Sequence, residues 1–330
     1  MSELRLNIIS KEWVIIASER AKRPEDFKKS KQVEVVPSHQ SNCPFCPGNE
    51  SVFPNDETSR IEKDGAWLVK SIYNKYPALS PDKNPARSFD GLENLIQGFG
   101  AHEVIIEHPR HDLTLALMPD KDVLNILKVY VDRYKILMKM KDIEAVTIFK
   151  NQGLAAGASQ KHPHSQIVAT PIVPPQTRTR LDNAIRYFDT TGKCVFCQML
   201  ASELKGKKRM VHETEKFVSF VPFAAAAPFI VWIFPKRHMP SFVDIDGEEL
   251  VDMAKILKDA LSRLYHGLDN PDFNYTIRSM PVNENGGEYF HWYLAIVPRI
   301  SQPAGFELGS GIFINATIPE DCADFLRQAQ

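Results

Sequence analysis

The stretch Asn151-Gln-Gly-Leu-Ala-Ala-Gly-Ala-Ser-Gln-Lys-His-Pro-His-Ser-Gln166 combines two histidines with two glycines and several small residues. The glycines and small residues allow a backbone to approach an anionic ligand closely. Pro163 biases His162 to an extended conformation, so His162 and His164 point to one side of a strand. One imidazole can then bind a metal while the other faces a ligand.

The cysteine spacing supplies partners for such a metal. Four of the five cysteines form two Cys-x-x-Cys pairs of identical spacing. Zinc prefers four Cys or His ligands in a tetrahedron, often one such pair with two later histidines. The predicted ligands are Cys43, Cys46, His111 and His162 for a first zinc site, and Cys194, Cys197, His238 and His291 for a second. Iron is the alternative metal at the second site.

Two other interpretations of the cysteine pairs remain open. A thioredoxin-type redox pair needs its first cysteine at a helix amino end, where the dipole lowers the pKa. Pro47-Gly48-Asn49 follows the first pair and indicates a turn instead. The thiols could also be inert core residues. Cys322, in a short helical segment, is predicted to serve packing alone.

The second histidine of His-Pro-His suits phosphoryl chemistry. An imidazole is largely neutral at pH 7 and can attack phosphorus without a separate base. A metal bound by His162 would fix the strand and aim His164 before substrate arrives. Gln166 and Ser159 are neutral donors that can hold phosphate oxygens. The alternative is that the motif serves only a metal or the core. His102, His108, His39, His212 and His266 show no partner pattern and are predicted to be surface or hydrogen-bonded residues.

The second half of the chain repeats the plan of the first. His-Pro-Arg-His111 is matched by Pro-Lys-Arg-His238, and His164 by His291, each with a proline seven residues later. Both separations are 53 residues (164 − 111 and 291 − 238). We therefore expect an α+β fold of two halves, residues 1–175 and 176–330, with a mostly antiparallel sheet and packed helices.

The individual elements follow from local patterns. Segment 80–100, rich in Pro, Asn and Gly, is predicted to be mostly loop. The predicted helices are 122–140 and 248–265, and the predicted strands are 12–17, 104–107, 146–150, 166–170, 229–234, 274–278 and 293–297.

Composition narrows the class of protein. The chain has 40 basic and 41 acidic residues and a net charge of −1, so duplex nucleic acid is a poor partner. No apolar run approaches the ~18 residues that span a membrane, so no membrane partner is expected. The amino end lacks the order of a signal peptide, and we expect a cytoplasmic protein.

Several motifs in register resemble the galactose-1-phosphate uridylyltransferase family, a branch of the histidine-triad superfamily, over nearly the whole chain. The motifs are Arg20-Ala-Lys-Arg-Pro24, Cys43-Pro-Phe-Cys-Pro-Gly48, Tyr73-Asn-Lys-Tyr-Pro77, His108-Pro-Arg-His111, His162-Pro-His-Ser-Gln166 with Asn151 and Ser159 upstream, His291-Trp-Tyr-Leu294 and Gly305-Phe-Glu307. The resemblance implies a histidine-triad-like fold, duplicated.

The resemblance also implies a ping-pong reaction and a homodimer whose sites take residues from both subunits. His164 would attack the α-phosphate of UDP-glucose, release hexose 1-phosphate and pass the uridylyl group to a second hexose 1-phosphate. Gln166 would stabilise the transferring phosphoryl group. The implied nucleotide, phosphate or hexose contacts are Arg20, Arg23, Asn74, Asn151, Ser159 and Glu307.

Two departures keep other activities open. Ser165 stands where many uridylyltransferases have Gly, and Phe313 stands where the family's glutamine is expected. This pattern also resembles the ADP-glucose phosphorylase-like branch, which transfers adenylyl to phosphate. A histidine-triad nucleotide hydrolase is a further alternative, although such proteins carry a third histidine where this chain has Gln166. A zinc-stabilised binding module without turnover is the last.

Overall fold

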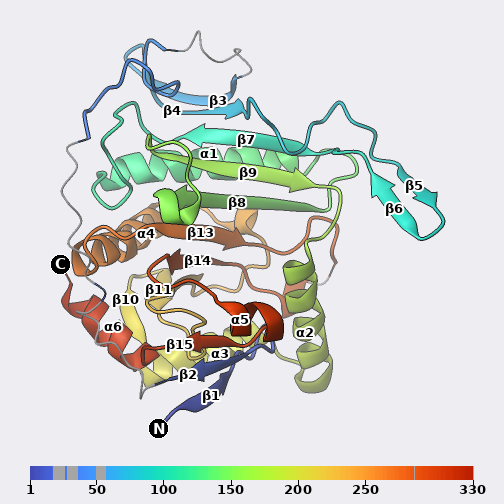
Figure 1. Ribbon diagram of the computed structural model, residues 1–330, viewed down its shortest axis with the longest axis vertical. Helices are drawn as coiled ribbons and strands as arrows, with labels where there is room; N and C mark the ends of the chain where they lie inside the picture. Colours follow the sequence, from blue (N-terminus) through green and yellow to red (C-terminus); the bar gives the residue numbers. More distant parts are fainter. Residues whose placement is uncertain (18–26, 28–35, 50–56, 286, 330) are drawn as a thin grey trace.

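A ten-stranded antiparallel sheet forms the centre of the protein in the computed structural model, which describes residues 1–17, 27, 36–49, 57–285 and 287–329 (Figure 1). Its strands, in spatial order, are β10 (Met210–Glu213), β11 (Phe217–Phe220), β12 (Val231–Pro235), β14 (Tyr293–Pro298), β13 (Phe273–Arg278), β8 (Ala145–Gln152), β9 (His164–Thr170), β7 (Ala101–Ile106), β4 (Ala66–Tyr73) and β3 (Glu57–Lys63). The expected α+β fold with a mostly antiparallel sheet is confirmed.

The strand order is the same in both directions from the middle of the sheet. Outward from the centre it runs β8, β9, β7, β4, β3 on one side and β13, β14, β12, β11, β10 on the other. Each half therefore repeats one five-stranded unit in the same chain order. The halves meet where β8 pairs with β13, with Asn151 opposite Asn274. This arrangement supports the expected duplication.

Two long helices cover one face of this sheet. α1 (Asp120–Leu137) and α4 (Gly247–Gly267) contact one another, and each follows the third strand of its half. Leu127 of α1 belongs to the same buried core as Ile105 of β7 and Ile167 of β9. Asp246 begins α4 with a capping box, in which its carboxylate accepts from the backbone N–H of Glu249 at 2.8 Å.

The remaining elements lie around this framework. They are α2 (Pro175–Thr191), α3 (Val195–Gly206), α5 (Gly305–Ser310), α6 (Pro319–Gln328), the short helices η4 (Leu154–Ala156), η5 (Phe242–Asp244) and η6 (Gly287–Tyr289), and a small sheet of β1 (Glu3–Leu6), β2 (Trp13–Ile16) and β15 (Phe313–Asn315). Cys322 is buried in α6 as expected, with its thiol directed to Thr317.

The segment 80–100 is mostly loop, as predicted, but it also has a feature that was not predicted. It contains a hairpin of β5 (Arg87–Asp90) and β6 (Glu93–Ile96), which projects from the body of the protein (Figure 1). Gly91 adopts φ +56° in the two-residue turn. The hairpin is exposed on both faces, so its strands lack the apolar alternation from which a strand is predicted.

Candidate active site and metal centres

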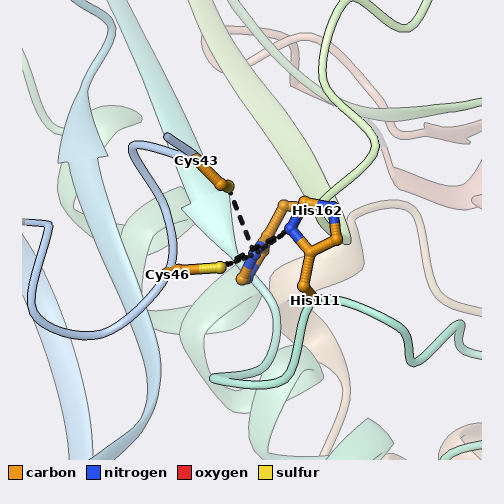
Figure 2. Close-up of side chains that lie close together, drawn as sticks. All are labelled: Cys43, Cys46, His111 and His162. Carbon is orange, nitrogen blue, oxygen red and sulfur yellow. Dashed lines mark hydrogen bonds between the residues drawn. The ribbon is translucent and has the colours of Figure 1, made fainter. Parts of the chain in front are cut away.

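Cys43, Cys46, His111 and His162 come together in a buried cluster (Figure 2). Cys46 Sγ lies 3.6 Å from Nδ1 of both histidines, Cys43 Sγ lies 3.7 Å from His162 Nδ1, and the two Nδ1 atoms are 3.3 Å apart. Tetrahedral zinc bonds of about 2.3 Å to sulfur and about 2.0–2.1 Å to nitrogen give edges of about 3.6 and 3.3 Å. The four donors therefore fit a tetrahedral metal ion.

Three separate segments deliver these ligands. The cysteines lie on a turn before β3, His111 follows β7, and His162 precedes β9. His162 Nε2–H donates to the carbonyl of His108 at 2.8 Å, which leaves Nδ1 for the metal. Burial lowers the pKa of His162 to about 4, so its ring is neutral, as a ligand must be.

The redox interpretation of the first pair has no support in this geometry. Cys43 starts a turn and not a helix, and burial raises the pKa of its thiol to about 11. A redox cysteine needs the opposite shift. In the metal-free protein the Cys43 thiol therefore stays protonated at neutral pH, and a divalent cation would favour the thiolate.

The second cluster is less regular. Cys194, Cys197 and His238 have donor atoms within 4.8 Å of one another, and Cys197 Sγ lies 3.1 Å from His238 Nδ1. His291, the fourth predicted ligand, has Nδ1 at 3.4 Å from Cys197 Sγ. His238 Nε2–H donates to the carbonyl of Gly287 at 2.8 Å, so its Nδ1 faces the cluster as His162 Nδ1 does in the first half.

The structure corrects one detail of the predicted repeat. His291 contacts Cys197 as His162 contacts Cys46. The counterpart of His291 is therefore His162 and not His164. The strands agree, since β9 begins two residues after His162 and β14 two residues after His291.

His164 is the first residue of β9 and is 7% exposed. Its Nδ1–H donates to the carbonyl of His162 at 2.9 Å, so Nε2 keeps its lone pair. Burial, and then the charge of Lys150, lowers the pKa of His164 and favours the neutral ring. The ring of Phe45, from the Cys43–Cys46 turn, packs 5.6 Å from His164 and 5.9 Å from His162, centroid to centroid. The turn that carries Cys43 and Cys46 thus also packs against the nucleophile predicted from the sequence.

A buried ion pair, not predicted from the sequence, supports the backbone at His164. Lys150 on β8 donates to Glu107 Oε2 at 2.7 Å and to the carbonyl of His164 at 3.0 Å, and both charged side chains are fully buried. Tyr130 OH also donates to Glu107 at 3.4 Å. The sequence does contain a signal for this ion pair, namely a lysine on the inward face of the apolar run Ala-Val-Thr-Ile-Phe-Lys150.

Three of the predicted substrate contacts gather around His164. Gln166 lies two residues along β9 on the same face, and Phe149 is directly opposite it on β8. Asn151 follows on that face of β8, and its side-chain oxygen accepts from Asn274 at 2.8 Å. Asn74 follows β4 and lies beside His102, which also contacts Gln166. His102 and Asn274 had no role predicted from the sequence.

The other predicted contacts have different outcomes. Ser159 is exposed in the loop between η4 and β9. Glu307 lies on α5, where its carboxylate accepts from the backbone N–H of Ala304 at 3.0 Å. It lines a cavity of about 360 Å³ together with Glu12, Arg278 and Phe313. Arg20 and Arg23 fall outside the described residues.

Together with the fold, comparisons with known proteins identify the chain as an enzyme of the nucleotidylyltransferase class. Models of the N-terminal and C-terminal domains of galactose-1-phosphate uridyl transferase match residues 1–174 and 180–300. An ADP-glucose phosphorylase from Arabidopsis thaliana is 39% identical over 99% of this chain and 92% of its own length. A galactose-1-phosphate uridylyltransferase from Thermotoga maritima is 31% identical over 100% and 99%. The chain belongs to the galactose-1-phosphate uridylyltransferase family.

Solved structures agree in fold. The chain superposes with a TM-score of 0.85 and 36% identity on an ADP-glucose phosphorylase from Arabidopsis thaliana with bound ADP-glucose, covering 100% of this chain and 99% of that one. A structure of uridylyltransferase gives a TM-score of 0.76 at 27% identity, covering 100% and 98%. Among the described residues, no helix is long and apolar enough to cross a membrane.

Proposed function

We propose that the chain transfers a nucleotidyl group from a sugar nucleotide to a phosphate-bearing acceptor through a covalent intermediate on His164. The observation that carries this proposal is the hydrogen bond of His164 Nδ1–H to the carbonyl of His162. It fixes the tautomer whose Nε2 is unprotonated, in a buried ring that remains neutral. Both conditions are needed for a nitrogen nucleophile.

The reaction has two balanced steps. Nε2 attacks the α-phosphorus, an N–P bond forms, and the P–O bond to the sugar phosphate breaks as hexose 1-phosphate leaves. An oxygen of the acceptor's phosphate then attacks the same phosphorus, the N–P bond breaks, and the electron pair returns to Nε2. Gln166 and Asn151 would donate to the phosphoryl oxygens where charge develops.

Two donors are candidates. Uridylyl transfer between UDP-glucose and hexose 1-phosphate is supported by the family models and by the Thermotoga relative. Adenylyl transfer from ADP-glucose to phosphate is favoured by a specific observation: the Arabidopsis phosphorylase is 39% identical over almost the whole chain. Phe313, in the cavity that holds Glu307, also departs from the uridylyltransferase pattern. Glu307 would contact the hexose.

The proposal extends to the metal. The first cluster would hold zinc through Cys43, Cys46, His111 and His162, and the second would hold zinc or iron through Cys194, Cys197, His238 and His291. The metal would supply a fixed anchor for the start of β9, and so for His164. Free thiols that act as metal ligands support a reducing, cytoplasmic location.

We also propose a homodimer and two halves divided near residue 175. Phe89, Leu92 and Leu95 on the β5–β6 hairpin are exposed, which supports burial of this hairpin against another chain. Glu307 lines a separate cavity from the residues around His164, which supports a site completed by a partner subunit. Sedimentation velocity tests the dimer. A monomer at micromolar concentration would contradict it.

The test of the reaction is the intact mass of the protein after brief mixing with UDP-glucose or with ADP-glucose. A UMP-sized or AMP-sized adduct, absent from His164→Ala, would establish the covalent step and identify the base. His266→Ala, at an exposed histidine near the end of α4, is the matched control and should form the adduct normally. Absence of any adduct from folded, metal-replete protein would refute the transferase.

The hydrolase alternative is separated by adding acceptors to the isolated adduct. A transferase consumes the adduct much faster with hexose 1-phosphate or inorganic phosphate than with water. Equal loss with and without acceptor would favour hydrolysis. Gln166 favours transfer, because an amide cannot protonate a leaving group as an imidazolium can.

A further inference from the structure

His102 lies beside Gln166 in the sheet. β7 pairs with β9 so that Val104 is opposite Gln166 and His102 is opposite Val168. His102 and Gln166 are therefore diagonal neighbours on the face that carries His164. Nε2 of His102 lies 2.7 Å from Oε1 of Gln166, a short and direct hydrogen bond.

The surroundings of His102 determine which nitrogen carries its proton. The backbone N–H of Ala78 donates to His102 Nδ1 at 3.1 Å. A backbone N–H can only donate, so Nδ1 must be an acceptor and has no proton. The single proton of the neutral ring is therefore on Nε2 and points to Oε1 of Gln166. A proton on Nδ1 would face the proton of Ala78.

This tautomer orients the Gln166 amide. An amide side chain has one accepting end and one donating end, and half a turn exchanges them. With Oε1 held by His102, the NH2 group faces away from His102, and Gln166 shares its face of the sheet with His164. Asn74 behaves similarly: its Oδ1 accepts from the backbone N–H of Tyr76 at 2.9 Å, and its Nδ2 lies 3.1 Å from His102 Nε2. Since that Nε2 donates to Gln166, it is no acceptor for Asn74, and the amide hydrogens of Asn74 also remain available.

We propose that His102 is a positioning residue that presents the NH2 group of Gln166 to the transferring phosphoryl group. This inference rests on the proposed function of His164. Without the His102 proton, the Gln166 amide can turn and place its oxygen against the phosphoryl oxygens, which repel it. The contribution of His102 then appears in the chemical step and not in the binding of sugar nucleotide, because the charge on those oxygens is rearranged during transfer.

Two substitutions separate the two bonds of His102. His102→Asn keeps an acceptor near the N–H of Ala78, since the amide oxygen can take the place of Nδ1, but it removes the donor to Gln166. His102→Gln extends an NH2 group to the place of Nε2 and loses the acceptor for Ala78. Each variant therefore retains one bond, and the pair serves as a matched control.

The assay is the single-turnover rate of adduct formation with the sugar nucleotide that labels wild-type protein, followed by quenched-flow mass spectrometry. Removal of a preorganised donor lowers the rate about 100–1,000-fold, and a donor that is present but misoriented should lower the rate by a smaller factor. We expect His102→Asn to slow the step about 10–100-fold with an unchanged dissociation constant, and His102→Gln to recover most of the rate. In the Gln166→Ala background, His102→Asn should add less than about twofold, because the two residues act as a unit.

The outcomes are distinct. No adduct from wild-type protein would refute the proposed function, and the inference with it. If wild-type protein forms the adduct and His102→Asn forms it at the same rate, the inference is overturned while the proposed function stands. The same holds if His102→Asn and His102→Gln slow adduct formation equally. Nitrogen-15 spectra of histidine-labelled protein give an independent readout, with the His102 signals assigned by their loss in His102→Asn. The Nε2–H tautomer is expected, and the Nδ1–H tautomer would overturn the inference whatever the activity.

Discussion

Replacement of Lys150 by methionine tests the buried support of β9 at His164. Met has a similar length and no charge, so the change removes the ammonium with little change in packing. Two groups lose a partner: the carboxylate of Glu107 at 2.7 Å and the carbonyl of His164 at 3.0 Å. Both side chains of the ion pair are fully buried, so water cannot replace the missing donor.

The magnitude follows from these two losses. Breaking a buried ion pair by removing one partner costs about 3–5 kcal/mol. A buried carbonyl without a hydrogen-bond donor costs about 1–3 kcal/mol, and we count this cost within the ~3–5 kcal/mol for the broken ion pair. We therefore expect Lys150→Met to lower the free energy of unfolding by about 3–5 kcal/mol. Lys150→Met/Glu107→Leu should lose only about 1–3 kcal/mol, since the double variant leaves the carbonyl without Lys150 while Tyr130 OH keeps its hydrogen bond with Tyr275.

Urea unfolding monitored by tryptophan fluorescence measures these differences, provided that the m values of the variants agree with wild type. Lys128→Met, at an exposed position of α1, is the control and should change stability by less than about 0.5 kcal/mol. The reasoning is refuted if Lys150→Met loses less than about 1 kcal/mol, or if the double variant is no more stable than the single one.

Three further predictions concern the metal, the nucleophile and the glycine loop. Cys46 contacts His111 and His162, the two predicted histidine ligands. Cys46→Ser should therefore remove one equivalent of metal per chain, measured by plasma mass spectrometry, and slow adduct formation about tenfold or more. Unchanged metal content would contradict the first cluster as a metal site. The pKa of His164 lies below the ordinary 6.5 because of burial, so the reactive neutral form is lost only as the pH falls below that value. The rate of adduct formation should accordingly be constant above about pH 6.5 and decline below it, and a decline that begins at higher pH would argue against His164. Gly153 has φ +84° and a Cβ there would lie 2.2 Å from the Asp272 carboxyl carbon, whereas Gly192, with φ +66°, has open space. Gly153→Ala should therefore lower the free energy of unfolding, measured with urea, by about 1–3 kcal/mol more than Gly192→Ala does. Equal losses would mean that backbone strain, which both positions share, is the only cost.

The sequence predicted elements whose burial is strongly periodic and missed those whose burial is slight. α4 has buried residues at regular helical spacing along its whole length, and it was predicted nearly to its ends. α2 buries only Leu181 and Ala184, so little apolar periodicity remains in its sequence. The β5–β6 hairpin buries almost nothing and was predicted as loop for the same reason.

The candidate site shows a similar division. The spacing of Cys and His residues predicts a metal site, because few other structures require these residue types at such spacing. The four residues predicted for the first cluster do lie together. His102 and Asn274 are ordinary polar residues whose roles arise from strand register. Register is a long-range property, fixed when β7 meets β9 and when β8 meets β13. No local pattern in this sequence contains it.

The repeated strand order separates the cysteine–histidine clusters from the proposed nucleophile, because only one half carries His164. Both halves place a histidine beside a cysteine pair, two residues before a strand begins. In the first half that strand begins with His164, and in the second with Tyr293. Tyr293 is 1% exposed and stacks on Phe234, with ring centroids 4.7 Å apart and an angle of 5° between the planes. The same backbone position thus holds the imidazole of His164 in one half and a packing aromatic ring in the other. We therefore expect a metal bound at the second cluster to affect stability and not the chemical step, because Tyr293 stands where His164 stands in the first half.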